Sequence, residues 1–378
     1  MLWRMTPAMV QEEIKKIGAH PGSWPIFANK CAILPLKLEQ VRTPAANVLK
    51  QEMLSLGGDA VTPMSTITGK DEYVNVILLG TGRQYQHLVD KLQTMDFFGL
   101  KTWREEIAKV LTVEQPTTTL ADDRVLHYER PLIMGILNLT PDSFYADSRV
   151  AAQDDVQAAV QLAGKLLIEG ADILDFGAES TRPGAQKISV DEEIKRLLPA
   201  LKAVRRAYPE AIISVDTYHA DTAHEALKNG ANIINDVSGQ DSLDMWGMVT
   251  LYHVPWIITH NGPGGIFEVT EKLLQRAEAL KVPKDKVILD PGIGFGKTVA
   301  ENLEIIRNLS VLTGYGYPVL LGTSRKSVIG KVLDLPAEER LEGTLATSVV
   351  GALQGANILR VHDVEANRRA VKMTEALK

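Results

Sequence analysis

The last two thirds of the chain repeat one pattern of apolar positions eight times. Short apolar runs of strand length alternate, for the most part, with longer segments whose apolar residues recur at helical spacing. The runs are LIMGILNL (132–139), ADILDFG (171–177), AIISVD (211–216), NIIND (232–236), PWIITH (255–260), KVILD (286–290), PVLLG (318–322) and NILRVHD (357–363). Strands that alternate with helices form parallel sheets with right-handed crossovers. Eight units over residues 131–378 therefore predict a (β/α)8 TIM barrel, which takes about 250 residues. An open doubly wound sheet is the alternative, but it usually has fewer units and a glycine-rich first turn.

The first 120 residues show a shorter and less regular pattern. Apolar runs at 31–38 and 73–80 predict strands, and segments 43–57 and 83–95 have the spacing of amphipathic helices. We therefore expect a small α/β domain here. The polar segment 112–124 lacks periodicity and predicts a linker, which places the domain boundary near residue 120. No acid–base pair or metal-ligand spacing stands out before this boundary, so the sequence leaves the function of the small domain open.

Composition narrows the class of protein. A single core becomes hard to extend beyond about 250 to 300 residues, so a chain of 378 residues favours two domains. The net charge of −6 argues against a general nucleic-acid binder. The first residues lose their apolar character too early for a secretory signal, and no run of 18 apolar residues predicts a membrane span. A single cysteine, Cys31, excludes an intrachain disulfide and a cysteine metal cluster. We expect a cytoplasmic protein.

Polar residues stand where each predicted barrel strand ends. In chain order these are Asn138, the segment Glu179-Ser180-Thr181-Arg182, Asp216, Asn235, His260, Asp290, the segment Ser324-Arg325-Lys326, and Arg360 with His362. The C-terminal ends of barrel strands meet at one mouth, where the chemistry of this fold takes place. One Asp or Asn in such a place can simply cap the next helix. Eight successive polar ends exceed what capping explains, and they predict a polar site at the mouth.

One segment partly matches two known binding motifs, but each match fails at a key position. The segment DPGIGFGKT (290–298) has proline at 291, where a phosphate-binding P-loop needs glycine. Lys297 occupies the place of the third glycine in the dinucleotide-binding fingerprint. We instead expect the glycines of this segment, Gly292, Gly294 and Gly296, to allow a tight turn or a close approach of the backbone to a ligand. The histidines at 219, 224, 253 and 260 lack the ligand spacing of a zinc site.

The residue types at the mouth indicate the chemistry of the ligand. Asp216, Asn235 and Asp290 offer carboxylate acceptors and an amide that both donates and accepts, which suits the edge of a guanine-like or pterin ring. Asn138 is a neutral oxygen ligand that can share Mg²⁺ with phosphates and water. Positive charge for a phosphate or diphosphate leaving group comes from Arg182, Arg325, Lys326, Arg360 and His362. No activated nucleophile is apparent, which favours displacement over covalent catalysis.

Seven segments of the barrel resemble those of the dihydropteroate synthase family and follow the order in that family. They are MGILNLTPDSF (134–144), GAESTRPGA (177–185), SVDT (214–217), NDVSG (235–239), DPGIGFGK (290–297), GTSRKS (322–327) and RVHD (360–363). The resemblance implies an enzyme that joins 6-hydroxymethyl-7,8-dihydropterin diphosphate to 4-aminobenzoate. The products would be diphosphate and 7,8-dihydropteroate, a step of folate biosynthesis. Residues 1–120 lie outside the catalytic domain that is usual in the family.

The resemblance also implies roles for individual residues. Asn138 would meet Mg²⁺ and diphosphate, and Lys326 would reach the pterin. The pterin edge would be bound by Asp216, Asn235 and Asp290. The diphosphate side would hold Arg360 and His362, with Arg360 also against the pterin face. A mobile second loop would contain Thr181, Arg182 and Pro183, and the aminobenzoate would lie near Phe144, Phe295 and Ser327. We expect catalytic roles for Lys326, Arg182 and Asp147.

The sequence departs from the family pattern at two places. The first loop continues Tyr145-Ala146-Asp147-Ser148 where Ser-Asp-Gly-Gly is common, so the loop carboxylate is displaced by one position. The fifth strand ends Thr259-His260-Asn261 instead of Met-His-Met, which alters the predicted pocket wall near the pterin. Neither change removes a principal binding group.

Two other functions fit parts of the same pattern. A methyltetrahydrofolate-dependent methyltransferase also holds a pterin in a barrel mouth, but it does not need the basic groups Arg182, Lys326 and His362. A non-catalytic pterin-binding protein would bind ligand without releasing diphosphate. The resemblance further implies a homodimer that binds small-molecule substrates. From the net charge and the apolar runs we expect no nucleic-acid partner and no membrane partner.

Overall fold

The computed structural model describes residues 5–139, 152–179, 187–240 and 242–377. The chain divides into two compact units, residues 1–113 and 114–378, which are described separately below. In the part of the chain that the structure describes, no helix is long and apolar enough to cross a membrane.

The first unit is built on a small antiparallel sheet. Among the described residues its strands are β1 (Leu34–Arg42), β2 (Asp59–Val61) and β3 (Tyr73–Gly80), in the order β1-β3-β2. Side chains of β3 alternate between buried and exposed, and Val74, Val76 and Leu78 form a core with the helices. These are α3 (Thr43–Ser55), α5 (Gly82–Leu92) and α6 (Leu100–Leu111), and the shorter helices are α1 (Pro7–Lys16), η1 (Pro21–Ser23), α2 (Trp24–Cys31) and α4 (Ser65–Thr68).

The predicted elements of this unit are confirmed in kind, with one shift. Strand β3 and helices α3 and α5 lie where the periodicity predicts them. The first strand begins at Leu34 instead of residue 31, because Cys31 is the last residue of helix α2. The apolar run begins within the helix, so its periodicity does not show where the helix ends and the strand begins.

The second unit is a closed parallel barrel, as the eightfold pattern predicts. Its strands in the described residues are β6 (Leu132–Asn138), β7 (Ile173–Gly177), β8 (Ile212–Asp216), β9 (Ile233–Asp236), β10 (Trp256–Thr259), β11 (Val287–Asp290), β12 (Leu320–Leu321) and β13 (Ile358–Val361). The hydrogen-bonded order is β11-β10-β9-β8-β7-β6-β13-β12. A parallel bridge between Leu289 and Val319 joins the two ends of this order and closes the barrel. The TIM-barrel prediction is therefore confirmed.

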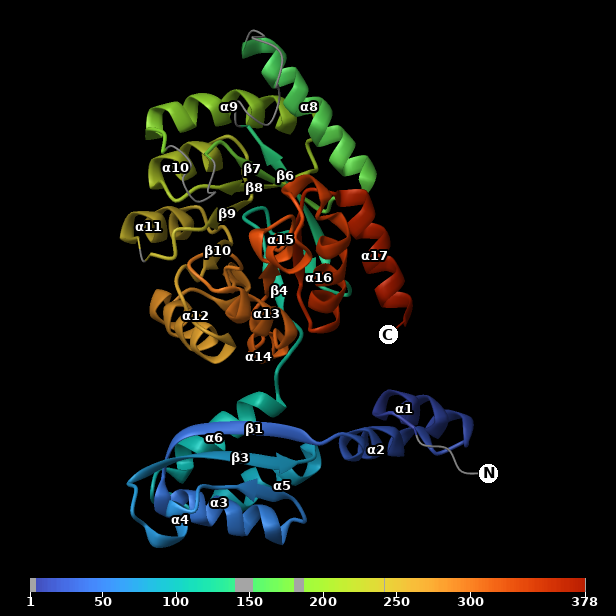
Figure 1. Ribbon diagram of the computed structural model, residues 1–378, viewed down its shortest axis with the longest axis vertical. Coiled ribbons are helices and arrows are strands. Elements are labelled where there is room, and N and C mark those ends of the chain that lie inside the picture. The colour runs from blue at the N-terminus through green and yellow to red at the C-terminus, as the bar shows by residue number, and fades with distance from the viewer. Residues whose placement is uncertain (1–4, 140–151, 180–186, 241, 378) are drawn as a thin grey trace. The chain divides into compact units, whose positions relative to one another are not determined.

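Helices surround the strands (Figure 1). They are α8 (Ala152–Glu169), α9 (Val190–Ala207), α10 (Ala220–Lys228), α11 (Leu243–Leu251), α12 (Ile266–Leu280), α13 (Val299–Arg307), α14 (Ser310–Thr313), α15 (Ser327–Leu333), α16 (Leu341–Leu353) and α17 (Val364–Leu377), with short turns η2 (Lys284–Lys286) and η3 (Ala337–Glu339). Because side chains alternate along a strand, one set packs under the helices and the other fills the barrel interior.

A hairpin closes the N-terminal end of the barrel. Strands β4 (Thr117–Thr119) and β5 (Val125–His127) pair antiparallel within the segment that the sequence predicts as a linker. Leu120 and Leu126 of this hairpin belong to the cluster of apolar side chains inside the barrel. Residues 117–127 are therefore part of the barrel core, and polar threonines hid this role from the hydrophobic pattern.

Candidate active site

An arginine joins two carboxylates across the C-terminal mouth of the barrel. Arg360 on β13 donates from Nε to Asp175 Oδ2 at 2.6 Å and from Nη2 to Asp216 Oδ2 at 2.7 Å. Asn235 on β9 donates from Nδ2 to the same Asp175 oxygen at 3.3 Å. Parallel strands with matched register bring these side chains together, since Asp216 and Asn235 are direct neighbours in the sheet. Residues of β7, β8, β9 and β13 thus build one hydrogen-bonded cluster.

Each acidic or amide member of this cluster keeps one oxygen for another donor. Asp175 Oδ1, Asp216 Oδ1 and Asn235 Oδ1 are buried and have no hydrogen-bond partner among the described residues. A buried acceptor without a partner costs about 1–3 kcal/mol. Three of them side by side are typical of a site that a donor-rich ligand completes.

Burial sets the protonation of the cluster. It raises the pKa of Asp216 to about 7, which the Arg360 guanidinium opposes and the negative charge of Asp175 reinforces. Burial alone would lower the pKa of Arg360, but the carboxylates of Asp175 and Asp216 raise it. The guanidinium therefore stays charged, and Asp216 can change its protonation state near neutral pH.

Asp290 and Lys326 are two further ionisable groups at the mouth, and each affects the pKa of the other. Asp290, the last residue of β11, accepts a 2.8 Å hydrogen bond from the backbone N–H of Gly292. Burial raises its pKa, and Lys326 opposes the rise. Burial lowers the pKa of Lys326 to about 8, against the effect of Asp290. Lys326 Nζ donates to the carbonyl of Ile293 and lies 4.7 Å from the centre of the Phe295 ring.

The predicted diphosphate side is organised by Ser324. Its Oγ lies 3.0 Å from His362 Nδ1 and accepts a 3.1 Å hydrogen bond from the backbone N–H of His362. Ser327 is exposed and is the first residue of α15. Arg325, which charge alone placed with the diphosphate groups, instead makes two hydrogen bonds to Asp363, at 3.0 and 2.7 Å. Its charge is neutralised by that carboxylate.

Asn138 ends β6 beside the acidic cluster. It is half-buried and pairs in register with Gly177 of β7. A Cβ atom at Gly177 would lie 3.4 Å from Asn138 Oδ1 and 3.8 Å from the Cβ of Asp216, so the glycine keeps this corner of the mouth open. In the described ranges no group of three His, Cys, Asp or Glu side chains could hold a metal by itself.

Five predicted site residues fall in the segments 140–151 and 180–186 and lie outside the described residues: Phe144, Asp147, Thr181, Arg182 and Pro183. The described ones are Asn138, Asp216, Asn235, Asp290, Phe295, Lys326, Ser327, Arg360 and His362. They stand at or near C-terminal strand ends or in the loops that follow, except Ser327, which begins α15.

Sequence reasoning passed over Asp175 although it binds Arg360 directly. It is fully buried in the middle of ILDFG, and an acidic residue inside an apolar strand cannot be a helix cap. That position was the available signal. His260 lines the same end, and burial lowers its pKa to about 4, so its imidazole is neutral at physiological pH.

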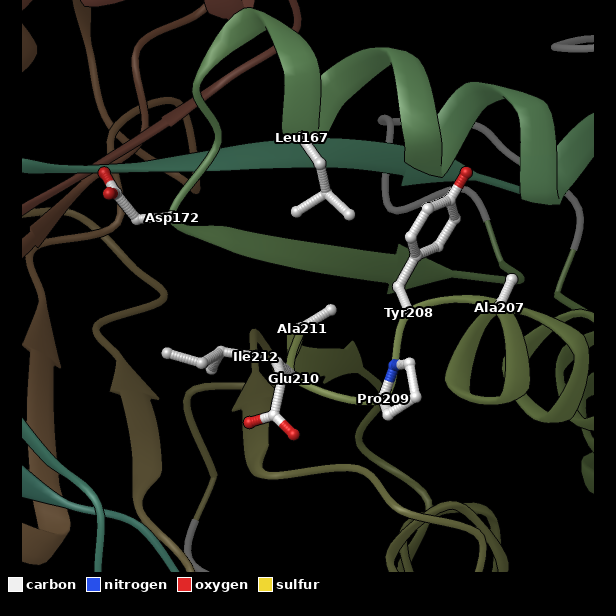
Figure 2. A pocket seen from close by; sticks show the side chains of 8 residues that line it. All are labelled: Leu167, Asp172, Ala207, Tyr208, Pro209, Glu210, Ala211 and Ile212. Atoms are coloured by element: carbon white, nitrogen blue, oxygen red, sulfur yellow. The ribbon is translucent and has the colours of Figure 1, made fainter.

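A pocket of about 430 Å³ lies at the opposite end of the barrel strands (Figure 2). Leu167, Asp172 and residues 207–212 line it, at the starts of β7 and β8. Arg130 binds both oxygens of Asp172, at 2.9 and 2.7 Å, so this carboxylate has no spare charge for a ligand. The chemistry gathers at the mouth instead.

Comparison with known proteins identifies relatives of the barrel. The family model described as "Pterin binding enzyme" matches residues 134–362. A dihydropteroate synthase of Clostridium beijerinckii is 44% identical over 66% of this chain and 95% of its own. A structure of Xanthomonas albilineans dihydropteroate synthase with 4-aminobenzoic acid is 36% identical, with a TM-score of 0.65 over 70% of this chain and 98% of that one.

Another relative extends over the small unit as well. The "Bifunctional dihydropteroate synthase/dihydropteroate reductase" of Helicobacter pylori is 31% identical over 99% of this chain and 98% of its own length. The first unit is therefore shared with this relative, whereas the Clostridium beijerinckii enzyme matches only two thirds of the chain.

Proposed function

The chain belongs to the family of pterin-binding enzymes, and we propose that the mouth of its barrel carries the residues of dihydropteroate synthesis named above. The enzyme condenses 6-hydroxymethyl-7,8-dihydropterin diphosphate with 4-aminobenzoate and releases diphosphate. One observation supports the site most strongly: three acceptor oxygens, on Asp175, Asp216 and Asn235, lie in a buried cluster and have no hydrogen-bond partner in the described part of the chain. The amino and ring N–H groups of a pterin are donors that match them.

The proposed site residues supply binding and charge, and no covalent enzyme intermediate is needed. The pterin edge binds Asp216, Asn235 and Asp290, while Arg360 lies against the ring and Lys326 reaches its polar atoms. The bond between the exocyclic methylene carbon and the diphosphate oxygen breaks, and the electron pair leaves with diphosphate. His362 and Arg182 stabilise the charge of this leaving group.

The second half of the reaction forms the carbon–nitrogen bond. The methylene cation is delocalised into the pterin ring until the amine of 4-aminobenzoate attacks it and then loses a proton to solvent. Phe144, Phe295 and Ser327 form the aminobenzoate side. Asp147 and Arg182 belong to loops that exclude water from the cation when substrates are bound.

Asn138 is the residue that would hold Mg²⁺. Magnesium is usually held by one or two protein oxygens together with substrate phosphates and water, so a single half-buried amide at the open corner of the mouth fits it. Bound there, Mg²⁺ would offset the negative charge of the leaving diphosphate. We also propose a cytoplasmic homodimer in which the first unit, residues 1–113, is an accessory domain that is not part of the catalytic barrel.

Diphosphate release with both substrates present tests this proposal. The wild-type chain should release diphosphate only when 4-aminobenzoate is added, and Asp216→Ala and Lys326→Ala should nearly abolish release while remaining folded. Ligand binding without release would favour a non-catalytic pterin-binding protein. Near-normal turnover in both variants would contradict the site assignment.

A second activity is suggested by the relative that matches the whole chain. The name of this relative includes dihydropteroate reductase, and the match covers the first unit as well as the barrel. We propose that the full chain also reduces 7,8-dihydropteroate to tetrahydropteroate, with two electrons and a proton delivered as hydride by a reduced nicotinamide or flavin and one proton from solvent. Oxidation of the reduced cofactor that depends on added dihydropteroate is the test. No such dependence with either cofactor would refute it.

A further inference from the structure

The loop that follows β11 packs tightly against the end of β10. Gly292 and Gly296 adopt φ angles of 67° and 64°, in the left-handed region that favours glycine. A Cβ atom at Gly292 would lie 2.0 Å from the carbonyl oxygen of His260, and one at Gly296 would lie 3.0 Å from the Cα of Gly262. The path of this loop is therefore fixed by close backbone contact.

Lys297 binds two backbone carbonyls of this loop and one carbonyl just after β10. Its Nζ donates to the carbonyl oxygens of His260 at 3.1 Å, Gly292 at 3.0 Å and Phe295 at 3.3 Å. Three backbone acceptors match the three donors of an ammonium group. The side chain thus ties the end of β10 to two points of the loop, and it does so from a half-buried position.

Lys326 binds the same loop at another point. Its Nζ donates to the carbonyl of Ile293, between the two loop carbonyls that Lys297 holds. It also lies 4.7 Å from the centre of the Phe295 ring, a cation–π distance. A Cβ atom at Gly294 would lie 3.3 Å from the Cδ of Lys326, so the loop follows the lysine stem closely.

We propose that Lys297 is a positioning residue for pterin binding. It holds the loop so that Ile293 and Phe295 place the Lys326 ammonium group against the pterin ring. This inference rests on the proposed pterin site. Lys297 acts through Lys326 and does not itself touch the substrate. Because a displacement of about 1 Å in a binding group can cost about a hundredfold, releasing the loop should weaken binding measurably.

The chain contains a matched control at the other end of the same strand. Lys286, just before β11, also donates to three backbone carbonyls, those of Thr119 at 2.6 Å, His253 at 2.9 Å and Leu120 at 3.4 Å. Burial lowers the pKa of Lys286 as it lowers that of Lys297. Lys286 therefore has the same type of interaction with backbone, but at the base of the barrel instead of the mouth.

Lys297→Met and Lys286→Met are compared in the full chain. Calorimetry measures the dissociation constant for 6-hydroxymethylpterin, and thermal unfolding measures stability. We expect both variants to melt at lower temperature than wild type, whereas only Lys297→Met binds the pterin about tenfold more weakly. In a Lys326→Met background, the further change Lys297→Met should leave the dissociation constant unchanged, because coupled residues are not additive.

The outcomes distinguish failure of the proposed pterin site from failure of the positioning role of Lys297. If the wild-type chain does not bind the pterin, the proposed site itself is wrong. If wild type binds and Lys297→Met binds equally well, or if both methionine variants weaken binding equally, the positioning role is wrong. Should Lys297→Met fail to fold, Lys297→Gln, which is one bond shorter but keeps a donor, is measured in the same way and read by the same criteria.

Discussion

The polar groups at the two ends of the barrel differ in whether their hydrogen bonds are satisfied. At the base, Asp172 accepts from both Arg130 nitrogens and from the backbone N–H of Ile133 at 2.8 Å. Asn232 Oδ1 there accepts from Arg205 at 2.8 Å and from the N–H of Ile213 at 2.9 Å. At the mouth, Asp175, Asp216 and Asn235 each leave an oxygen without a partner in the described residues.

This difference separates stability from function along each strand. A paired polar group at the base orders a loop and satisfies the backbone, so it contributes to folding. An unpaired buried oxygen at the mouth lowers stability until a ligand donates to it. TIM barrels carry their chemistry at the C-terminal ends of their strands, and the distribution of unpartnered oxygens follows that rule here. The same side-chain type should therefore give opposite results when it is removed at the two ends.

The largest effect is expected for Asp216→Ala at the mouth. It removes the proposed acceptor for the pterin and one partner of Arg360, so kcat/KM should fall about 10²- to 10³-fold, as it does for other preorganised site groups. Asp175 still holds Arg360, so the melting temperature should change little. Steady-state diphosphate release and thermal unfolding measure the two quantities. A variant that loses stability in proportion to activity would erase the proposed contrast between the ends.

Asp172→Ala at the base is the reciprocal change. It leaves Arg130 and the N–H of Ile133 without their acceptor, which should lower the free energy of unfolding by about 1–3 kcal/mol. Because the site lies at the other end of the strands, kcat/KM measured well below the melting temperature should stay within about twofold. Urea unfolding gives the first quantity. A large fall in kcat/KM without unfolding would show that the base also shapes the site.

A pH profile tests the raised pKa at the mouth. The folded-state pKa of Asp216, about 7, exceeds the value of about 3.9 for an unfolded chain, so its stabilising contribution is present at low pH and is lost as pH rises through 7. Pterin N–H groups favour the ionised carboxylate, so affinity should rise about tenfold between pH 6 and 8. The lysines with pKa values of about 8, Lys326 and Lys297, should reverse the trend above that pH.

Asp216→Asn provides the control for this profile. The amide does not titrate, so the rise in pterin affinity between pH 6 and 8 should disappear while the decline above pH 8 remains. Calorimetric titration at several pH values measures both limbs. An unchanged acid limb in Asp216→Asn would assign it to another group.

The sequence carried enough information for the barrel and for most of the mouth. Repeated apolar runs predict eight strands because parallel strands are buried on both faces, and strand ends then converge by topology. What the pattern could not show is which side chains meet. Asp175 and Arg360 are 185 residues apart, and the pairing of Arg325 with Asp363 depends on the exact geometry between β12 and β13. The contacts of Lys297 could not be predicted either, because it binds backbone carbonyls, which every residue type has.

The smallest effect is expected where the mouth resembles the base. Arg325 stands beside Lys326, yet its bidentate pair with Asp363 is partly exposed, with 31% and 24% of the two side chains accessible. Partly exposed ion pairs contribute about 0–1 kcal/mol, so Arg325→Gln should change stability within that range. Because Asp363 already neutralises its charge, kcat/KM should fall by no more than about twofold, whereas Lys326→Gln should lose most activity. If Arg325→Gln were as inactive as Lys326→Gln, the ion pair of Arg325 with Asp363 would have to open during catalysis. The position of a residue at the mouth would then predict its function better than its ion pairing does.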